Sequence, residues 1–141
     1  MANVIPFAFR GELFSATHDF SSGGDQFKLA LYTANPYTTS STAYDATSEV
    51  SASGTAYTTT GNVLTGNAVA SGTAVASCDF DPSVWSSATF TAAFGAIYND
   101  DKSDKLCVVL DFSGNKACTN GTFTVTFPSP TSPADAIISM A

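Results

Sequence analysis

The fold of this chain is decided by residues 78–127, which read CDFDPSVWSSATFTAAFGAIYNDDKSDKLCVVLDFSGNKACTNGTFTVTF. Apolar residues recur at every second position in three runs of this stretch, and a period of two is typical of a half-buried β-strand. The alternating positions are Phe90, Ala92, Phe94, Ala96 and Tyr98, then Leu106, Val108, Leu110 and Phe112, and finally Phe123, Val125 and Phe127. Turn-forming residues at 99–104 and 113–115 separate the runs, so we predict an antiparallel meander of three strands.

The same period of two predicts further strands on both sides of this stretch. Residues 26–33 form a clear strand pattern, residues 74–80 form another, and residues 136–140 predict a last short strand. Short strands separated by turn signals are typical of an all-β sandwich or barrel. We expect a β-sandwich of jelly-roll-like antiparallel sheets with at most one short helix near the N-terminus, for which residues 10–20 are the only candidate.

The length of 141 residues fits a single domain. Within it we expect residues 1–25 to form an N-terminal arm that includes any short helix, and residues 26–141 to form the β-sandwich. Large apolar side chains of the alternating runs, together with the only tryptophan, are expected to form the core scaffold. These residues are Trp85, Phe90, Phe94, Tyr98, Leu110, Phe112, Phe123 and Phe127.

Charge is scarce in this chain and is mostly negative. Only 12% of the residues are charged, and 5 Lys and Arg against 12 Asp and Glu give a net charge of -7. So few cations cannot neutralise a phosphate backbone, and we therefore expect no nucleic-acid partner. No apolar run is long enough to span a bilayer, so we expect no membrane partner. The many Ser and Thr residues give a surface that is cheap to desolvate, which suits a permanent assembly.

The cysteines and the N-terminus indicate a protein made in a reducing cytoplasm. The first residues lack the basic start and the apolar core of a signal peptide. Cys78, Cys107 and Cys118 are odd in number and lack the spacing of a metal site, so free thiols are the plain interpretation. A disulfide between Cys107 and Cys118 across the predicted hairpin stays open.

No residue pattern predicts an active site. His18 is the only histidine, and although Asp19 adjoins it, no serine lies in a nucleophile motif, so we interpret His18 as a surface or capping residue. One histidine and scattered cysteines do not make a zinc site. The acidic turn at 99–104 lacks the glycine and distal glutamate of a calcium loop, so solvated residues are the simpler interpretation and calcium stays open. We expect that the protein is not an enzyme and that it binds no cofactor and no metal ion.

Two irregular regions are candidates for binding a partner. The period-two pattern near the N-terminus is interrupted by Pro6, which predicts an edge strand or an arm that packs on a neighbouring subunit. Residues 34–62 are rich in Thr, Ser and Tyr, which predicts a long surface loop. The candidate contact residues are Ile5, Phe7 and Phe9 in the first region and Tyr37 and Tyr44 in the second. We expect that deleting residues 2–9 leaves a folded domain that no longer binds its partner.

The order of motifs over residues 26–128 resembles a family of small proteins encoded near the head genes of tailed bacteriophages. Its most specific residues are Asp81, Trp85, Thr89, Ala96, Ile97, Tyr98 and Asn99, followed by Asp111, Phe112, Gly121, Thr122 and Phe123. The resemblance implies a virion structural protein of the capsid decoration or cement type. It further implies binding to the major capsid protein and to copies of itself, as a homodimer or homotrimer, on the capsid surface after assembly in the host cytoplasm.

Two other functions stay open. One is a tail or fibre-adaptor component of the same particle, which would differ from a head protein in copy number and position. The other is a carbohydrate-binding module in which Trp85 stands exposed with tyrosine partners. These tyrosines are Tyr32, Tyr37, Tyr44 and Tyr57. A buried Trp85 would exclude the sugar platform, and a core tryptophan at the end of the sandwich is the commoner case.

Overall fold

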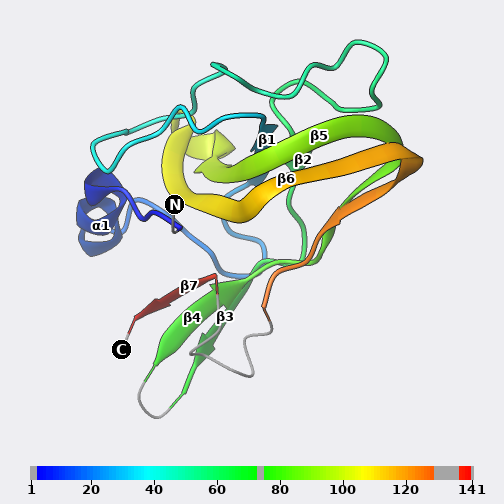
Figure 1. Cartoon of the computed structure of the whole chain (residues 1–141). Coiled ribbons are helices and arrows are strands. Elements are labelled where there is room, and N and C mark those ends of the chain that lie inside the picture. The colour runs from blue at the N-terminus through cyan, green and yellow to red at the C-terminus, as the bar shows by residue number, and fades with distance from the viewer. Residues whose placement is uncertain (1–2, 73–74, 129–136, 141) are drawn as a thin grey trace.

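The computed structural model describes residues 3–72, 75–128 and 137–140 (Figure 1). Its elements in chain order are α1 (Phe7–Phe14), β1 (Phe27–Tyr32), β2 (Asn62–Val63), β3 (Ala68–Ser71), β4 (Ala76–Asp79), β5 (Ser83–Asn99), the 3-10 turn η1 (Asp100–Lys102), β6 (Lys105–Val125) and β7 (Ile138–Met140). The strands form two antiparallel sheets, with the orders β2-β1-β5-β6 and β3-β4-β7. The prediction of an all-β fold with antiparallel sheets and a short N-terminal helix is confirmed.

The prediction of a three-stranded meander is wrong, because its second and third runs belong to one strand. β6 continues through residues 113–115 and pairs with β5 on both sides of them, so the two strands form one long hairpin closed by η1. Ser113 and Gly114 have φ angles of 57° and 106°, and the register shifts opposite them, between Ala92 and Phe94 of β5. These turn formers make a β-bulge, which uses the same left-handed backbone as a turn.

The bulge also moves apolar side chains to opposite faces of the hairpin. Phe90 and Ala92 pack into the larger core cluster, whereas Phe94, Ala96 and Tyr98 pack into a second cluster. The prediction that these five residues share one face is therefore wrong. The change coincides with the register shift, where only Ala93 of β5 lies between the paired positions and four residues of β6 lie opposite it.

A second register shift, between Ile97 and Tyr98, has the same effect on β6. Leu106 packs into the second cluster, while Val108 and Leu110 pack into the larger one. The predicted common face of this run is wrong because one extra residue of β6, Cys107, turns the side chains before and after it to opposite faces. Two bulges thus let a single hairpin contribute to both clusters.

The larger cluster joins the two sheets through aromatic side chains. Phe80, which follows β4, lies 5.6 Å from Phe27 of β1 and 5.9 Å from Phe127, measured between ring centroids. Of the expected core scaffold, Trp85, Phe90, Tyr98, Leu110, Phe123 and Phe127 are buried, and Phe94 and Phe112 are partly buried against the core. The small sheet is therefore attached to the main sheet through a shared apolar core.

The helix begins and ends earlier than the sequence predicts. α1 starts directly after Pro6, which is the N-cap and has an extended backbone, and residues 15–20 are not helical. Phe9 is fully buried, and Phe20 stacks on Phe27 with ring centroids 4.3 Å apart. The segment before β1 is thus packed into the core through Phe9 and Phe20.

The remaining strands lie close to their predicted positions. β1 and β4 fall within the runs at 26–33 and 74–80, and β7 occupies the end of the run at 136–140. Residues 74 and 136 lie outside the described residues.

Candidate binding surfaces

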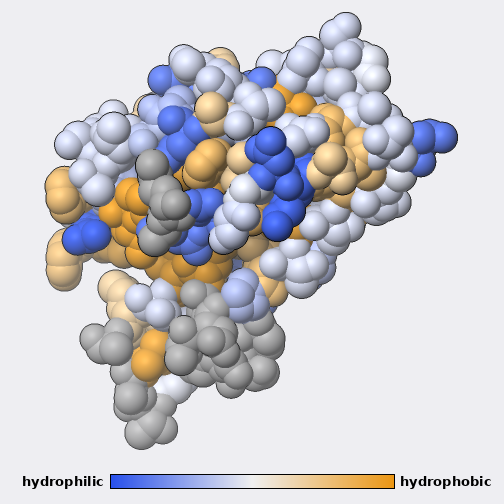
Figure 2. Space-filling model, in the orientation of Figure 1, coloured by the Kyte–Doolittle hydropathy of each residue, from blue (hydrophilic) through white to orange (hydrophobic). Residues whose placement is uncertain are grey.

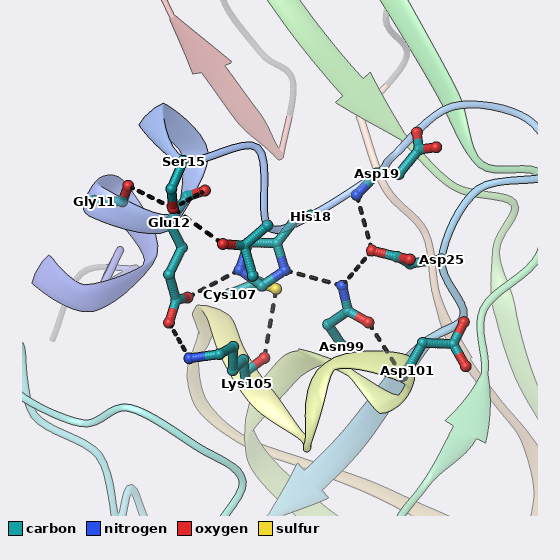
Figure 3. Close-up of polar contacts among 11 residues, drawn as sticks. Gly11, Glu12, Ser15, His18, Asp19, Asp25, Asn99, Asp101, Lys105 and Cys107 are labelled. Atoms are coloured by element: carbon teal, nitrogen blue, oxygen red, sulfur yellow. Dashed lines mark hydrogen bonds and ion pairs between the residues drawn. The ribbon is translucent and has the colours of Figure 1, made fainter.

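His18 lies at the centre of a buried hydrogen-bond network that joins the N-terminal segment to the turn of the hairpin (Figure 3). Its ring Nε2 donates to Glu12 Oε2 at 2.9 Å, and its Nδ1 accepts from Asn99 Nδ2 at 2.9 Å. The ring also packs beside Phe9, with centroids 5.1 Å apart. The His18 side chain is 0% exposed, so its interpretation as a surface or capping residue is wrong.

The polar groups around His18 fix one another's orientation. Asn99 Nδ2 donates its second hydrogen to Asp25 Oδ2 at 2.9 Å, so inverting the Asn99 amide would place two acceptor oxygens together. Lys105 Nζ donates to Glu12 Oε1 at 2.5 Å. A neutral imidazole with its hydrogen on Nε2 satisfies all of these contacts. The network therefore pins α1 in one position against β5 and β6.

The two carboxylates of this network have lowered pKa values. Burial alone raises the pKa of Glu12, but the hydrogen bonds from Lys105 and His18 and the nearby positive charge outweigh it, so the pKa falls below 4.5. Burial likewise raises the pKa of Asp25, and hydrogen bonds led by that from Asn99 lower it further than burial raises it. Both groups are therefore ionised at neutral pH and act as fixed acceptors.

The geometry of this network does not suit catalysis. Both ring nitrogens of His18 are engaged and its ring is closed to solvent, so the imidazole has no access to a substrate proton. Burial raises the pKa of the Cys107 thiol, drawn with the network in Figure 3, well above its usual value. Such a thiol stays protonated and is a poor nucleophile. The network is therefore a structural clamp on the N-terminal segment.

The acidic turn, which the sequence leaves open for calcium, is engaged by neighbouring side chains. Asp100 pairs with Lys28 at 2.9 Å and accepts from Gln26 Nε2 at 2.8 Å, and Asp101 accepts from the Gln26 N–H at 2.7 Å. In the part of the chain that the structure describes, no three His, Cys, Asp or Glu side chains are grouped so that they could hold a metal ion. These carboxylates fasten the hairpin turn to the start of β1.

Glu49 is the centre of a second network, which holds the long excursion of residues 33–61 between β1 and β2. Its Oε2 accepts from Tyr44 OH at 2.6 Å, and its Oε1 accepts from Tyr57 OH at 2.7 Å and from the Thr60 N–H at 2.8 Å. Burial and the hydrogen bonds to the carboxylate raise the pKa of Tyr44 and Tyr57, so both phenols stay donors. Sequence reasoning missed Glu49, although a lone glutamate between tyrosines was a usable signal.

Further hydrogen bonds attach the excursion to the sheet beneath it. Tyr37 OH lies 2.7 Å from Tyr32 OH and accepts from the Asp45 N–H at 2.9 Å. The Leu106 N–H of β6 donates to Thr42 O at 3.0 Å. The excursion lacks regular strands, but its own inward-facing tyrosines hold it, as in compact surface loops.

The outer face of the excursion is nearly uncharged and rich in hydroxyl groups. Its exposed residues between 38 and 48 are Thr38, Thr39, Ser40, Thr42, Ala43, Asp45, Ala46, Thr47 and Ser48, and we call them the excursion surface. Asp45 is the one charged residue among them, since Glu49 turns inward to its tyrosines. A fixed surface with so little charge loses little on desolvation, which favours contact with a partner.

A second candidate surface lies between α1 and the three-stranded sheet. Leu13 and Phe14 on one side and Ile138 and Met140 on the other line a hollow of about 380 Å³. A smaller hollow of about 110 Å³ continues it towards Val69. Phe14 is 94% exposed and Met140 is 57% exposed. Figure 2 shows apolar side chains gathered above the lobe that the small sheet forms, and we call this surface the apolar cleft.

The five expected contact residues are divided between core and surface. Phe9 and Tyr37 are buried, Ile5 and Tyr44 are partly buried, and Phe7 is exposed. Val4 exchanges two backbone hydrogen bonds with Val109 of β6. Deleting residues 2–9 would remove this pairing and the core side chain of Phe9, so we no longer expect the deletion to leave the domain intact.

Burial also bears on two alternatives that the sequence left open. Trp85 is 3% exposed and stacks on the buried Tyr57, so it does not form the exposed platform that a sugar would need. The three cysteines are free thiols, and Cys107 and Cys118 lie on the same strand, so the disulfide considered between them is not formed.

Comparisons of the chain with protein-family models, with curated proteins and with solved structures found no match. The resemblance to small phage proteins therefore rests on the sequence motifs alone. Within the described residues, none of the helices has the length and apolar character needed to cross a bilayer.

Proposed function

We propose that this protein is a non-enzymatic structural component of a virus particle, a capsid decoration protein that binds and stabilises the shell of the major capsid protein. The excursion surface carries the proposal. It is exposed and nearly uncharged, and the Glu49 network holds it from below. Such a surface suits permanent binding to a partner, which supports a structural role.

The physical requirements of a decoration protein agree with this surface. A shell offers the same site many times, so a modest contact repeated over the lattice gives a stable assembly. A loop that is already fixed loses little conformational freedom on binding. The sequence resemblance supports a location on the head rather than elsewhere in the particle.

A tail or fibre-adaptor component is the second candidate, because the same surface suits docking on a ring of subunits. The two locations differ in copy number. Quantitative mass spectrometry of particles produced from the genome that carries this gene separates them. Copies in proportion to the major capsid protein support decoration, copies in proportion to the tail ring support the second candidate, and absence from the particle overturns both.

The role of the excursion surface is tested by placing a charge on it. Thr42→Glu adds a carboxylate at an exposed position and is expected to lower the occupancy of purified, undecorated shells at least tenfold. Thr124→Glu, at an exposed position on β6, is the matched control and is expected to leave occupancy unchanged. Equal binding of both variants, with circular dichroism showing intact folds, would remove the excursion surface from the proposal.

A further inference from the structure

The apolar cleft places a protruding aromatic side chain beside a hollow. Phe14 stands at the end of α1 with 94% of its surface exposed, and the hollow of about 380 Å³ opens next to it. α1 cannot withdraw the ring, because Glu12 and His18 clamp the helix. A monomeric protein rarely leaves a large aromatic side chain and a neighbouring apolar hollow both open to water.

A patch that carries both the protrusion and the hollow is complementary to itself. In a two-fold symmetric dimer each residue of the patch meets the same surface on the other copy, so every contact is made twice. The other chemistry of the patch agrees, since interface centres are enriched in aromatic residues, Met and Arg. Arg10 lies against the ring of Phe7, with its guanidinium carbon 5.3 Å from the ring centroid, and Met140 lines the hollow.

The charges around the cleft also suit a second copy of this chain. Arg10 is the only charged side chain among the described residues that line the two hollows, so the net charge of -7 is carried elsewhere. Two copies that meet through the cleft therefore bring no acidic side chains of these described lining residues together.

We propose that this protein forms a two-fold symmetric dimer in which Phe14 of each copy enters the apolar cleft of the other. The inference goes beyond the proposed virion function and does not depend on it. It uses a surface separate from the excursion surface, so one copy can bind a partner through the excursion while it is paired with another copy through the cleft.

Sedimentation velocity over a range of protein concentrations tests the dimer with the purified chain alone. The wild type is expected to pass from monomer to dimer as its concentration rises. Phe14→Lys and Met140→Glu each place a charge in the contact and are each expected to stay monomeric. Val84→Glu, at another apolar position with 46% exposure, is the matched control and is expected to dimerise like the wild type.

A mixture of the two monomeric variants tests the reciprocal contact between Phe14 of one copy and Met140 of the other. In a mixed dimer, one contact joins the native Phe14 to the native Met140, and the other joins the new lysine to the new glutamate. Phe14→Lys and Met140→Glu are therefore expected to form a heterodimer when mixed, and native mass spectrometry detects it. A wild type that stays monomeric at every concentration, a trimer, or dimers of Phe14→Lys alone would each overturn the proposal. Failure of the mixture to pair would overturn the reciprocal contact between Phe14 and Met140.

Discussion

The two glutamates of this chain hold two different regions in place. Glu12 fixes the N-terminal segment through an ion pair with Lys105 and a hydrogen bond from His18. Glu49 fixes the excursion through hydrogen bonds from the neutral phenols of Tyr44 and Tyr57. One region exposes apolar side chains and the other exposes hydroxyl groups, so the same kind of anchor supports two surfaces of different chemistry.

The different donors predict the pH at which each hydrogen-bond network is lost. The Glu12 network depends on carboxylates whose pKa values are lowered, so protonation of these groups at acid pH disrupts it. The Glu49 network depends on phenols whose pKa values are raised, so ionisation of these groups at alkaline pH disrupts it. Loss of either anchor is expected to free one surface before the sheets unfold, because each network ties a connecting segment to the sheet.

The largest effect is expected from removing the anchor with the most donors. Glu49→Ala leaves two phenol hydroxyls and the Thr60 N–H without their acceptor, and each unpaired buried group costs about 1–3 kcal/mol. We expect the free energy of unfolding, measured by urea denaturation, to fall by roughly 3 kcal/mol or more. Glu49→Gln keeps a carbonyl acceptor and is expected to lose about half as much. A loss below about 1 kcal/mol for the alanine variant would show that the excursion is held by other contacts.

The Glu12 network is broken most sharply at Asn99. Asn99→Asp keeps the size of this fully buried side chain but removes both N–H donors and places a carboxylate against Asp25. We expect a loss of about 2–3 kcal/mol in the free energy of unfolding. Asp101→Asn, two residues further on, keeps an acceptor for the Gln26 N–H and is the matched control. Equal stabilities of the two variants would contradict the clamp.

The sequence predicted the strands well because their signal is local. The alternation of apolar and polar residues in β1 and in the two halves of β6 can be recognised from a few consecutive residues. Ser113 and Gly114 gave the right backbone and the wrong topology, because a left-handed residue serves a bulge as well as a turn. These residues form a bulge and not a turn because β5 is long enough to pair with β6 on both sides of them.

The networks could not be predicted in the same way, because their partners are distant in the sequence. His18 and Asn99 are 81 positions apart, and Lys105 and Glu12 are 93 positions apart. His18 therefore looked like a surface residue, and Phe9 looked like part of a free arm. The excursion surface was predicted as a loop from its composition, but the inward turn of Tyr37 depends on the sheet below it.

Opposite pH responses are the next, smaller effect. The pKa of Glu12 is lowered in the fold, so its contribution to stability is complete above its ordinary value of 4.5 and is lost as the pH falls through the folded value. The pKa of Tyr57 is raised, so its contribution is complete below its ordinary value of 10.0 and is lost as the pH rises beyond it.

Urea denaturation at several pH values measures both limbs. Glu12→Gln is expected to make the loss of stability at acid pH less steep and to leave the alkaline response unchanged. Tyr57→Phe is expected to make only the loss at alkaline pH less steep, because other shifted groups such as Asp25 and Tyr44 remain. Ultraviolet titration of the wild type is expected to show buried tyrosines that do not ionise at their ordinary value. Changes on the wrong limb in either variant would contradict the assignment of the two networks.

The smallest effect on folding is expected at the most exposed aromatic side chain. Phe14 makes little contact with the rest of its own chain, since it is 94% exposed, so Phe14→Ser is expected to change the monomer's free energy of unfolding by less than about 0.5 kcal/mol. Its effect should appear only through association, because a dimer stabilises the folded state by mass action. The midpoint of thermal unfolding is therefore expected to rise with protein concentration in the wild type and to stay constant in Phe14→Ser. A large loss of stability at the lowest concentration would instead mean that Phe14 packs within its own chain and is not free to enter a second copy.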